Sequence, residues 1–148
     1  MATFSASATV ALQVSATYTK TTPLASASLS PKFTVSVNLS TTDISKMYQN
    51  SYSAQSSPVT LDLTSLTDDY GQSISFGSLK GAWIYNTDNT ATLVVGGGTN
   101  PALGTDQYTI TPGKLLPITS VFTVDGTHKN LVLTPSASMS FQLILVGS

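Results

Sequence analysis

The N-terminal segment alternates between apolar and mostly polar residues with almost no interruption. Its apolar positions occupy every second place, and Ser, Thr and Gln fill most places between them: Phe4, Ala6, Ala8, Val10, Leu12, Val14, Ala16 and Tyr18. A repeat of two residues places successive side chains on opposite sides of a strand, whereas a helical face repeats every 3.6 residues. The pattern therefore predicts one long half-buried strand, or two collinear strands, ended by Pro23.

Composition extends the β prediction to the whole chain of 148 residues. Every acidic residue is Asp and every basic residue is Lys, so the chain lacks Glu and Arg, which favour exposed helix faces. Ser and Thr make up roughly 30% of the residues, well above the usual share for globular domains. A hydrophobic fraction of 41% can supply a core, and we expect a single domain spanning residues 1–148.

Further strand-like runs follow along the chain. They lie at 33–39, 59–63, 74–76, 79–85, 91–95, 108–110, 114–123, 131–133 and 139–146. We expect the 131–133 run to pair with the 114–123 run across the Asp125-Gly126 turn. The final run is apolar on both faces near its end, so it is expected to be a central, buried strand.

One segment departs from the two-residue repeat of the strand-like runs. Between Asp43 and Gln49, the residues Ile44, Met47 and Tyr48 have helical spacing, and Thr42 can cap the first turn. With this exception the pattern is that of strands separated by turns. It predicts an all-β fold, a two-sheet antiparallel β-sandwich that is jelly-roll-like and has at most one short helix.

Several classes of partner are disfavoured by charge and composition. A net charge of -1 without clustered basic residues gives no electrostatic footprint for nucleic acid. The chain has no Cys, which excludes disulfides and thiolate chemistry. No segment has the ~18 apolar residues of a membrane span, and the N-terminal residues do not resemble a signal peptide. We therefore expect neither a nucleic-acid partner nor a membrane.

Three consecutive glycines, Gly96–Gly98, follow an apolar run and invite comparison with a phosphate-binding loop. Such a loop needs a helix after it and a Lys next to Ser or Thr at its end, and neither is present. The glycines lead instead into Asn100-Pro101, which is typical of a turn between strands. We expect an exposed loop whose glycines use positive φ or tight packing.

Candidates for catalysis and metal binding are sparse. His128 lies three residues after Asp125, with no Gly-x-Ser-x-Gly elbow in the chain, so a solvated loop histidine is expected. Most of the aspartates lie at predicted turns, where we expect the short side chain to accept hydrogen bonds from the turn backbone. Asp68, Asp69, Asp88 and Asp106 could supply oxygen ligands to calcium, but no spaced loop motif is present. The expectation is therefore no enzyme activity, no metal and no cofactor.

Trp83 and Tyr85 share one face of a strand, and Ile84 occupies the other. Three interpretations remain open at this point. The two aromatic rings could fill the sandwich core, which is favoured, or form a subunit interface, or make a platform for a sugar.

Short signatures follow one another over the chain from Ile44 to the end. In order they are Leu61-Asp62-Leu63, Thr67-Asp68 with Gly71, Ile74-Ser75-Phe76, Trp83, Val95-Gly96-Gly97, Asn100-Pro101, Pro112-Gly113 and Val146-Gly147. This order resembles a group of small tailed-phage and prophage virion structural proteins. The resemblance implies a capsid decoration protein, or a related head or tail accessory protein, without enzymatic activity. It implies a homo-oligomer such as a trimer, in contact with the major capsid protein of the virion, after synthesis in the host cytoplasm without a signal peptide.

The alternative function is a receptor- or carbohydrate-binding module of a phage tail or fibre, for which long loops with exposed aromatic or polar clusters would be expected. The short connections favour the decoration protein. Within the N-terminal alternation, Val10–Tyr18 is expected to join the sandwich, whereas the smaller residues before it are suited to a neighbouring subunit or the major capsid lattice. This possible interface comprises Thr3, Phe4, Ser5, Ala6, Ser7, Ala8 and Thr9.

Overall fold

The computed structural model describes residues 18–22, 25–29, 45–67, 71 and 73–148. The chain divides into two compact units, Met1–Thr41 and Thr42–Ser148. All regular elements of the described residues are strands, and every pair of strands is antiparallel. The all-β prediction is therefore confirmed. The described residues include no helical segment with the length and hydropathy of a membrane span.

In the first unit the described residues form one hairpin. Strands β1 (Tyr18–Thr22) and β2 (Ala25–Leu29) pair from Tyr18 opposite Leu29 to Thr22 opposite Ala25. β1 ends before Pro23, as expected of a residue that cannot donate to a sheet. Tyr18 pairs with β2, and the rest of the 4–18 alternation, with the 33–39 run, lies outside the described residues.

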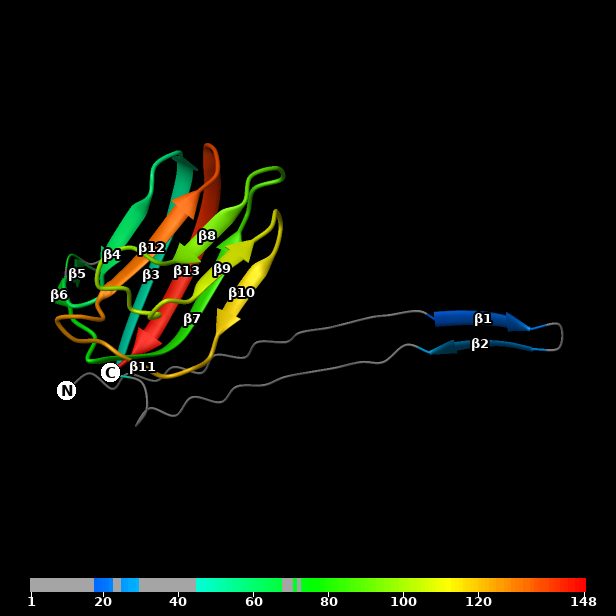
Figure 1. Ribbon diagram of the computed structural model, residues 1–148, viewed down its shortest axis with the longest axis horizontal. Helices are drawn as coiled ribbons and strands as arrows, with labels where there is room; N and C mark the ends of the chain where they lie inside the picture. The colour runs from blue at the N-terminus through cyan, green and yellow to red at the C-terminus, as the bar shows by residue number, and fades with distance from the viewer. Residues whose placement is uncertain (1–17, 23–24, 30–44, 68–70, 72) are drawn as a thin grey trace. The chain divides into compact units, whose positions relative to one another are not determined.

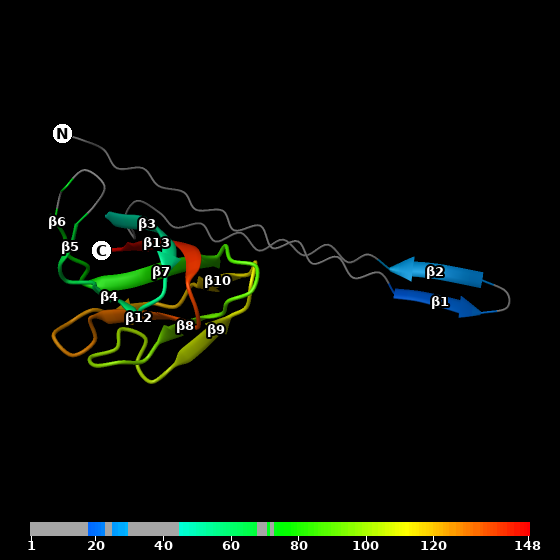
Figure 2. The same cartoon turned by 90° about the horizontal axis from the view of Figure 1, so that it is seen from above.

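The second unit contains two main sheets, which Figure 2 shows as separate layers. One sheet has the order β10-β7-β13-β3, with β11 also paired to β7, and the other has the order β4-β12-β8-β9. The strands of the first sheet are β3 (Lys46–Gln55), β7 (Ser78–Asn86), β10 (Leu115–Ile118), β11 (Phe122–Thr123) and β13 (Met139–Gly147). Those of the second are β4 (Val59–Asp62), β8 (Leu93–Gly96), β9 (Gln107–Ile110) and β12 (Asn130–Pro135). A small hairpin, β5 (Leu66–Thr67) with β6 (Ser73–Ile74), completes the unit (Figure 1).

The pairing of the strands is nested. β8 pairs with β9, β7 with β10, β4 with β12 and β3 with β13, so the outermost partners are the first and last strands of the unit. Successive members of this nested series alternate between the two sheets. The expected central position of the final strand is confirmed, because β13 lies between β7 and β3.

The core lies between the facing sides of the two sheets. β13 contributes alternate residues, Phe141, Leu143 and Leu145, and β12 contributes Leu131 and Leu133, all essentially inaccessible to solvent. Each fully buried side chain of this size contributes about 1.5–3 kcal/mol relative to its exposed form. Period-two burial of this kind requires a fixed register, since a slip by one residue would turn the whole apolar set outward.

One polar side chain is buried among these apolar residues. Asn86 is fully buried at the end of β7, and its Nδ2 donates to the carbonyl oxygens of Ala91 at 2.9 Å and Ile110 at 3.1 Å. Its Oδ1 accepts from the backbone N–H of Asp88 at 3.0 Å. The amide thus joins the end of β7 to the start of β8 and the end of β9.

One sequence-based prediction about this unit is wrong, and the one helix candidate does not form in its described part. At Asp43–Gln49, where at most a short helix was allowed, Lys46–Gln49 begins β3 and pairs with β13. Long-range pairing with a central strand outweighs the weak helical spacing of a few residues. The 131–133 run does not pair with the 114–123 run either, since β12 lies in the other sheet between β4 and β8.

The triple glycine has the backbone conformation that was predicted. Gly96, Gly97 and Gly98 have φ of 106°, 75° and 82°. A Cβ added at Gly96 would lie 2.3 Å from the carbonyl oxygen of Asp106, so tight packing also requires glycine there. The expected exposure is only partly correct, because Gly96 and Gly97 are buried and Gly98 alone is exposed.

Candidate binding face

The side of the β10-β7-β13-β3 sheet that points away from the core has an unusual composition. Alternation along each strand identifies the residues of this side, because their chain neighbours Ala82, Ile84, Leu143 and Leu145 belong to the core. We call it the outer face. It comprises Leu115 and Pro117 of β10, Gly81, Trp83 and Tyr85 of β7, Gln142, Ile144 and Val146 of β13, and Met47, Gln49 and Ser51 of β3.

The strand register arranges the outer face in rows. One row runs Leu115, Tyr85, Gln142, Ser51 across the four strands. The next runs Pro117, Trp83, Ile144, Gln49, and the third runs Gly81, Val146, Met47 across three strands. Directly opposed side chains of this kind are near neighbours, so the face is one continuous surface.

Exposure of large apolar side chains is concentrated here. Among the described residues, five large hydrophobic side chains are exposed, and four of them belong to the outer face. The four are Met47 at 40%, Tyr85 at 41%, Leu115 at 46% and Ile144 at 42%. Single exposed hydrophobic residues are ordinary, but a contiguous group marks an interaction surface.

Trp83 belongs to this face and not to the core. Its indole lies over Gly81, where an added Cβ would come within 2.7 Å of Cη2 and 2.9 Å of Cζ3 of the ring, and within 3.1 Å of a methyl of Val146. The ring is only 8% exposed, and its Nε1 is buried without a hydrogen-bond partner. The favoured prediction of a core role is wrong for Tyr85, which is exposed. Trp83 is buried, as predicted, but outside the core cluster between the sheets, into which Ile84 points.

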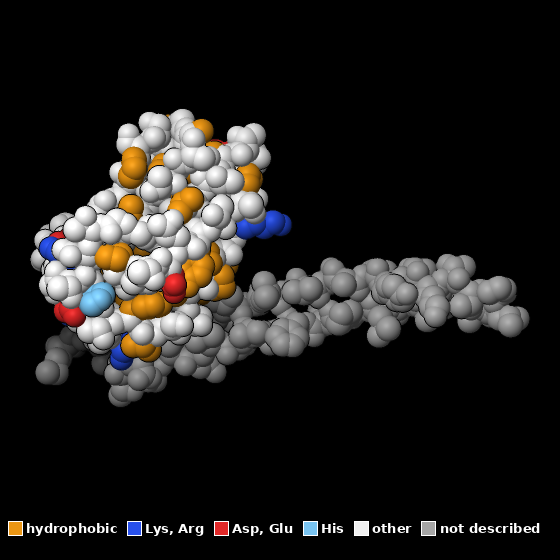
Figure 3. All heavy atoms as spheres, in the orientation of Figure 1, with side chains coloured by type: hydrophobic (Ala, Val, Ile, Leu, Met, Phe, Trp, Pro, Cys, Tyr) orange, Lys and Arg blue, Asp and Glu red, His pale blue; other side chains and the backbone are white. Residues whose placement is uncertain are grey.

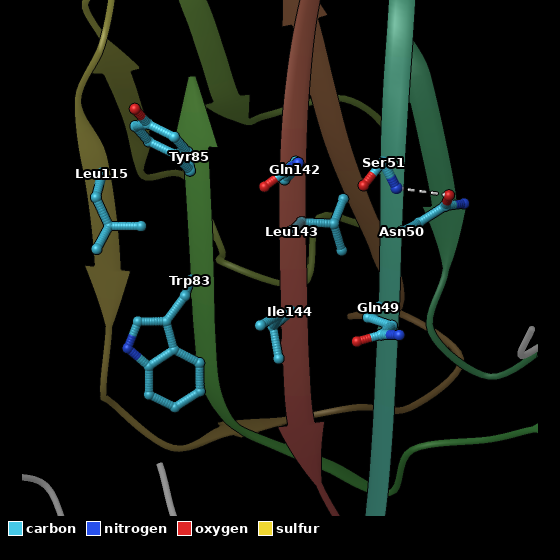
Figure 4. A pocket seen from close by; sticks show the side chains of 9 residues that line it. All are labelled: Gln49, Asn50, Ser51, Trp83, Tyr85, Leu115, Gln142, Leu143 and Ile144. Carbon is cyan, nitrogen blue, oxygen red and sulfur yellow. Dashed lines mark hydrogen bonds between the residues drawn. The ribbon is translucent and has the colours of Figure 1, made fainter. Parts of the chain in front are cut away.

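A hollow of about 430 Å³ lies in the middle of the outer face. Figure 4 shows how side chains from four strands surround it, with Leu115, Tyr85 and Trp83 on one side and Gln49 and Ser51 on the other. Gln142 and Ile144 of β13 lie between them. None of the residues that line the hollow is charged, so a partner there meets aromatic, aliphatic, amide and hydroxyl groups only.

The opposite side of the sandwich differs in character. Figure 3 shows that side, where hydrophobic side chains stand in small separate groups among polar ones, together with acidic, basic and histidine side chains. Its strands alternate regularly, as in β9, where Ile110 is buried and Thr109 is exposed. The contrast indicates that the outer face of the β10-β7-β13-β3 sheet is the specialised surface.

The Asp125–His128 loop lacks the geometry of a catalytic triad. Nδ1 of His128 lies 3.2 Å from Oδ1 of Asp125 and 3.0 Å from the hydroxyl oxygen of Thr127. The carboxylate and the hydroxyl group therefore contact the same ring nitrogen. A triad base needs them on different nitrogens. Both His128 and Asp125 are about half exposed, which agrees with a solvated loop histidine. The N–H and hydroxyl of Thr127 lower the pKa of Asp125 to about 2.

Of the remaining aspartates of the prediction, Asp88 acts as a turn former, whereas Oδ2 of Asp106 lies 3.5 Å from the hydroxyl of Tyr108. Oδ1 of Asp88 accepts from the N–H groups of Thr90 and Ala91, each at 2.8 Å, and these bonds, led by that of Ala91, lower its pKa. Asp68 and Asp69 lie outside the described residues. Elsewhere in the described ranges, no three potential metal-ligating side chains of His, Cys, Asp or Glu gather at one place.

The predicted interface residues, Thr3–Thr9, lie outside the described residues. The outer face was not predicted as a whole, although the pairing of Trp83 with Tyr85 and the apolar residues on both faces of the last strand were its signals. Comparisons of the chain with protein-family models, with curated proteins and with solved structures find no match.

Proposed function

We propose that the chain is a non-enzymatic structural protein of a tailed-phage virion, a capsid decoration protein that binds and stabilises the capsid lattice as an oligomer. The observation that carries the proposal is the outer face, which has four exposed large hydrophobic side chains and a hollow lined by uncharged residues. Protein interfaces are depleted of charge at their centres and enriched in aromatic residues and Met. A protein that works by complementary surfaces needs such a face and no reactive group.

The strand order supports the same proposal. Nested pairing of eight strands, alternating between a five-stranded and a four-stranded sheet, favours a jelly roll. Jelly rolls occur in viral capsid and lectin domains. Together with the resemblance of the chain from Ile44 onward to virion proteins, this supports the major capsid protein and other copies of the chain, as in a trimer, as the proposed partners.

The alternative of a carbohydrate-binding tip is less well supported. Stacking of a sugar on an aromatic platform needs an exposed ring face, and the Trp83 ring is 8% exposed. Tyr85 is the only aromatic ring on the outer face that is accessible, at 41%. The exposed aliphatic side chains of Met47, Leu115 and Ile144 are better suited to contact with a protein than with a polar sugar.

The test is a charge placed at the centre of the outer face. Ile144→Lys should fold normally, because this side chain is 42% exposed and points away from the core. Its binding to capsids of the phage or prophage that carries the gene should fall by at least about tenfold in co-sedimentation, since an unpaired buried charge costs several kcal/mol. Thr109→Lys, on the exposed side of β9, is the matched control and should bind as the parent does. Equal binding by both variants would exclude the outer face as the attachment surface.

A further inference from the structure

The size of the outer face limits what can cover it. Strands lie about 4.8 Å apart and residues advance about 3.3 Å, so four strands and three rows make a surface roughly 20 Å across, on the order of 400 Å². A stable interface between globular proteins buries about 800 Å² on each partner. The outer face is therefore too small to be a whole globular interface, and it matches the footprint of one extended segment.

The hollow indicates what such a segment must provide. It is rimmed by apolar atoms of Tyr85, Leu115 and Ile144, which suit an aromatic or aliphatic anchor. The side-chain amide of Gln142 at its margin can both donate to and accept from a peptide backbone. The matching segment is uncharged, carries one large apolar side chain, and is otherwise small enough to approach the sheet closely.

The chain itself contains a segment of this description. Residues 1–19 carry no charge, and in Thr3–Thr9 the apolar positions are Phe4, Ala6 and Ala8. Seven extended residues span about 23 Å, close to the width of the outer face. The ring of Phe4 can anchor in the hollow. The methyl groups of Ala6 and Ala8, on the same side of the segment, let its backbone lie close to the sheet next to the hollow.

We propose that Thr3–Thr9 of a neighbouring copy docks on the outer face, with Phe4 in the hollow between Tyr85, Leu115 and Ile144. This inference rests on the proposed function, because it names the partner that the outer face holds in the oligomer. Aromatic anchors in central pockets carry most of the binding energy of small interfaces. The contact is head-to-tail, and such contacts close into rings when the rotation allows.

The absence of Cys makes a clean cross-linking test possible in the full-length chain. Single-Cys variants are mixed in pairs under mild oxidation, so a heterodimer can arise only between different copies. Ala6→Cys, the next position after Phe4 on the docked side of the segment, should form a disulfide with Ile144→Cys. Ala8→Cys lies about 6.6 Å further along and should form little. Ser5→Cys and Ser7→Cys lie on the other side of the segment and should form no disulfide with Ile144→Cys. Thr109→Cys, paired with each of the segment variants, should form no disulfide either. Phe4→Ala should reduce oligomer formation in sedimentation equilibrium, while Ser5→Ala should leave it unchanged.

Other outcomes overturn the inference. Cysteines at even-numbered and odd-numbered positions of the segment could give the same yield of heterodimer. The segment would then not dock as an ordered strand. A disulfide within one chain of an Ala6→Cys, Ile144→Cys double variant, at high dilution, would assign the contact to the same copy. A shift of Trp83 emission by cellohexaose or maltohexaose, without cross-links, would make the hollow a saccharide site. If cross-links fail while Ile144→Lys still abolishes capsid binding, the inference falls and the proposed function stands.

Discussion

Gly81→Ala tests how the outer face is built. The added methyl would lie 2.7 Å from Cη2 of Trp83 and 3.1 Å from a methyl of Val146, both well inside ordinary contact. The backbone at Gly81 does not have a positive φ, so alanine is not strained there by itself. The ring must therefore lift off the sheet, and the substitution reports on packing alone.

The expected magnitude follows from two opposing contributions. Forcing an extra methyl into a packed site costs about 1–3 kcal/mol. Replacing glycine by alanine also restricts the unfolded chain, which stabilises the fold by about 0.4–1 kcal/mol. The balance is a loss of about 1–2 kcal/mol in the free energy of unfolding, or roughly 0.5–1 M in the urea midpoint for a protein of this size.

Urea unfolding followed by tryptophan emission measures both effects, because Trp83 is the only tryptophan. The native emission of Gly81→Ala should shift to longer wavelength as the ring leaves the sheet. Gly126→Ala is the matched control, since a Cβ there meets nothing within 4 Å and φ is not positive. If Gly81→Ala were as stable as Gly126→Ala and had unchanged emission, the packing of the indole on Gly81 would be refuted.

Three further predictions concern stability and chemistry. Asn86→Ala should lower the free energy of unfolding by about 2–4 kcal/mol in urea melts, because it leaves two buried carbonyl groups without their donors. The ammonium of Lys129, 2.7 Å from Asp62, lowers the pKa of Asp62 to about 2. The stabilisation is therefore present above the ordinary carboxyl pKa of about 3.9 and is lost as pH falls from about 4 to 2. Asp62→Asn should flatten that part of the stability profile, by no more than about 1 kcal/mol because the pair is partly exposed. Chelation of calcium, and His128→Ala, should each leave the melting temperature and capsid binding unchanged.

Strand positions were largely predictable from the sequence, and pairing was not. Period-two runs located β4, β7, β8, β9, β12 and β13, because each of these strands buries one face in the core. β2 escaped detection although its residues, Ala25–Leu29, alternate, because Leu29 is the only large apolar residue among them. β12 was assigned to the wrong partner because its nearness along the chain to the 114–123 run suggested a hairpin. In the nested arrangement β12 pairs instead with β4, in the other sheet.

The sequence could not decide which face of β7 is buried. Trp83 and Tyr85 on one side and Ala82 and Ile84 on the other are both apolar sets, and the larger rings suggested the core. The distance between two packed sheets is about 10 Å, which small and branched side chains such as Ala82 and Ile84 fill. The rings lie outside, where Gly81 leaves space for the indole. A glycine two residues before a tryptophan in a strand was the available signal.

The last strand shows why an apolar face on the outside calls for a partner. Leu143 and Leu145 explain the core, and a sandwich needs nothing apolar at the positions between them. Ile144 is nevertheless 42% exposed, and its row continues through Trp83 to Pro117. A solvated sheet face would be expected to carry Thr, Ser or charged residues at these positions, as Thr109 does on the other sheet. Folding alone does not require a row of apolar residues on the solvent side of the sheet. Such a row is explained if another chain covers the outer face.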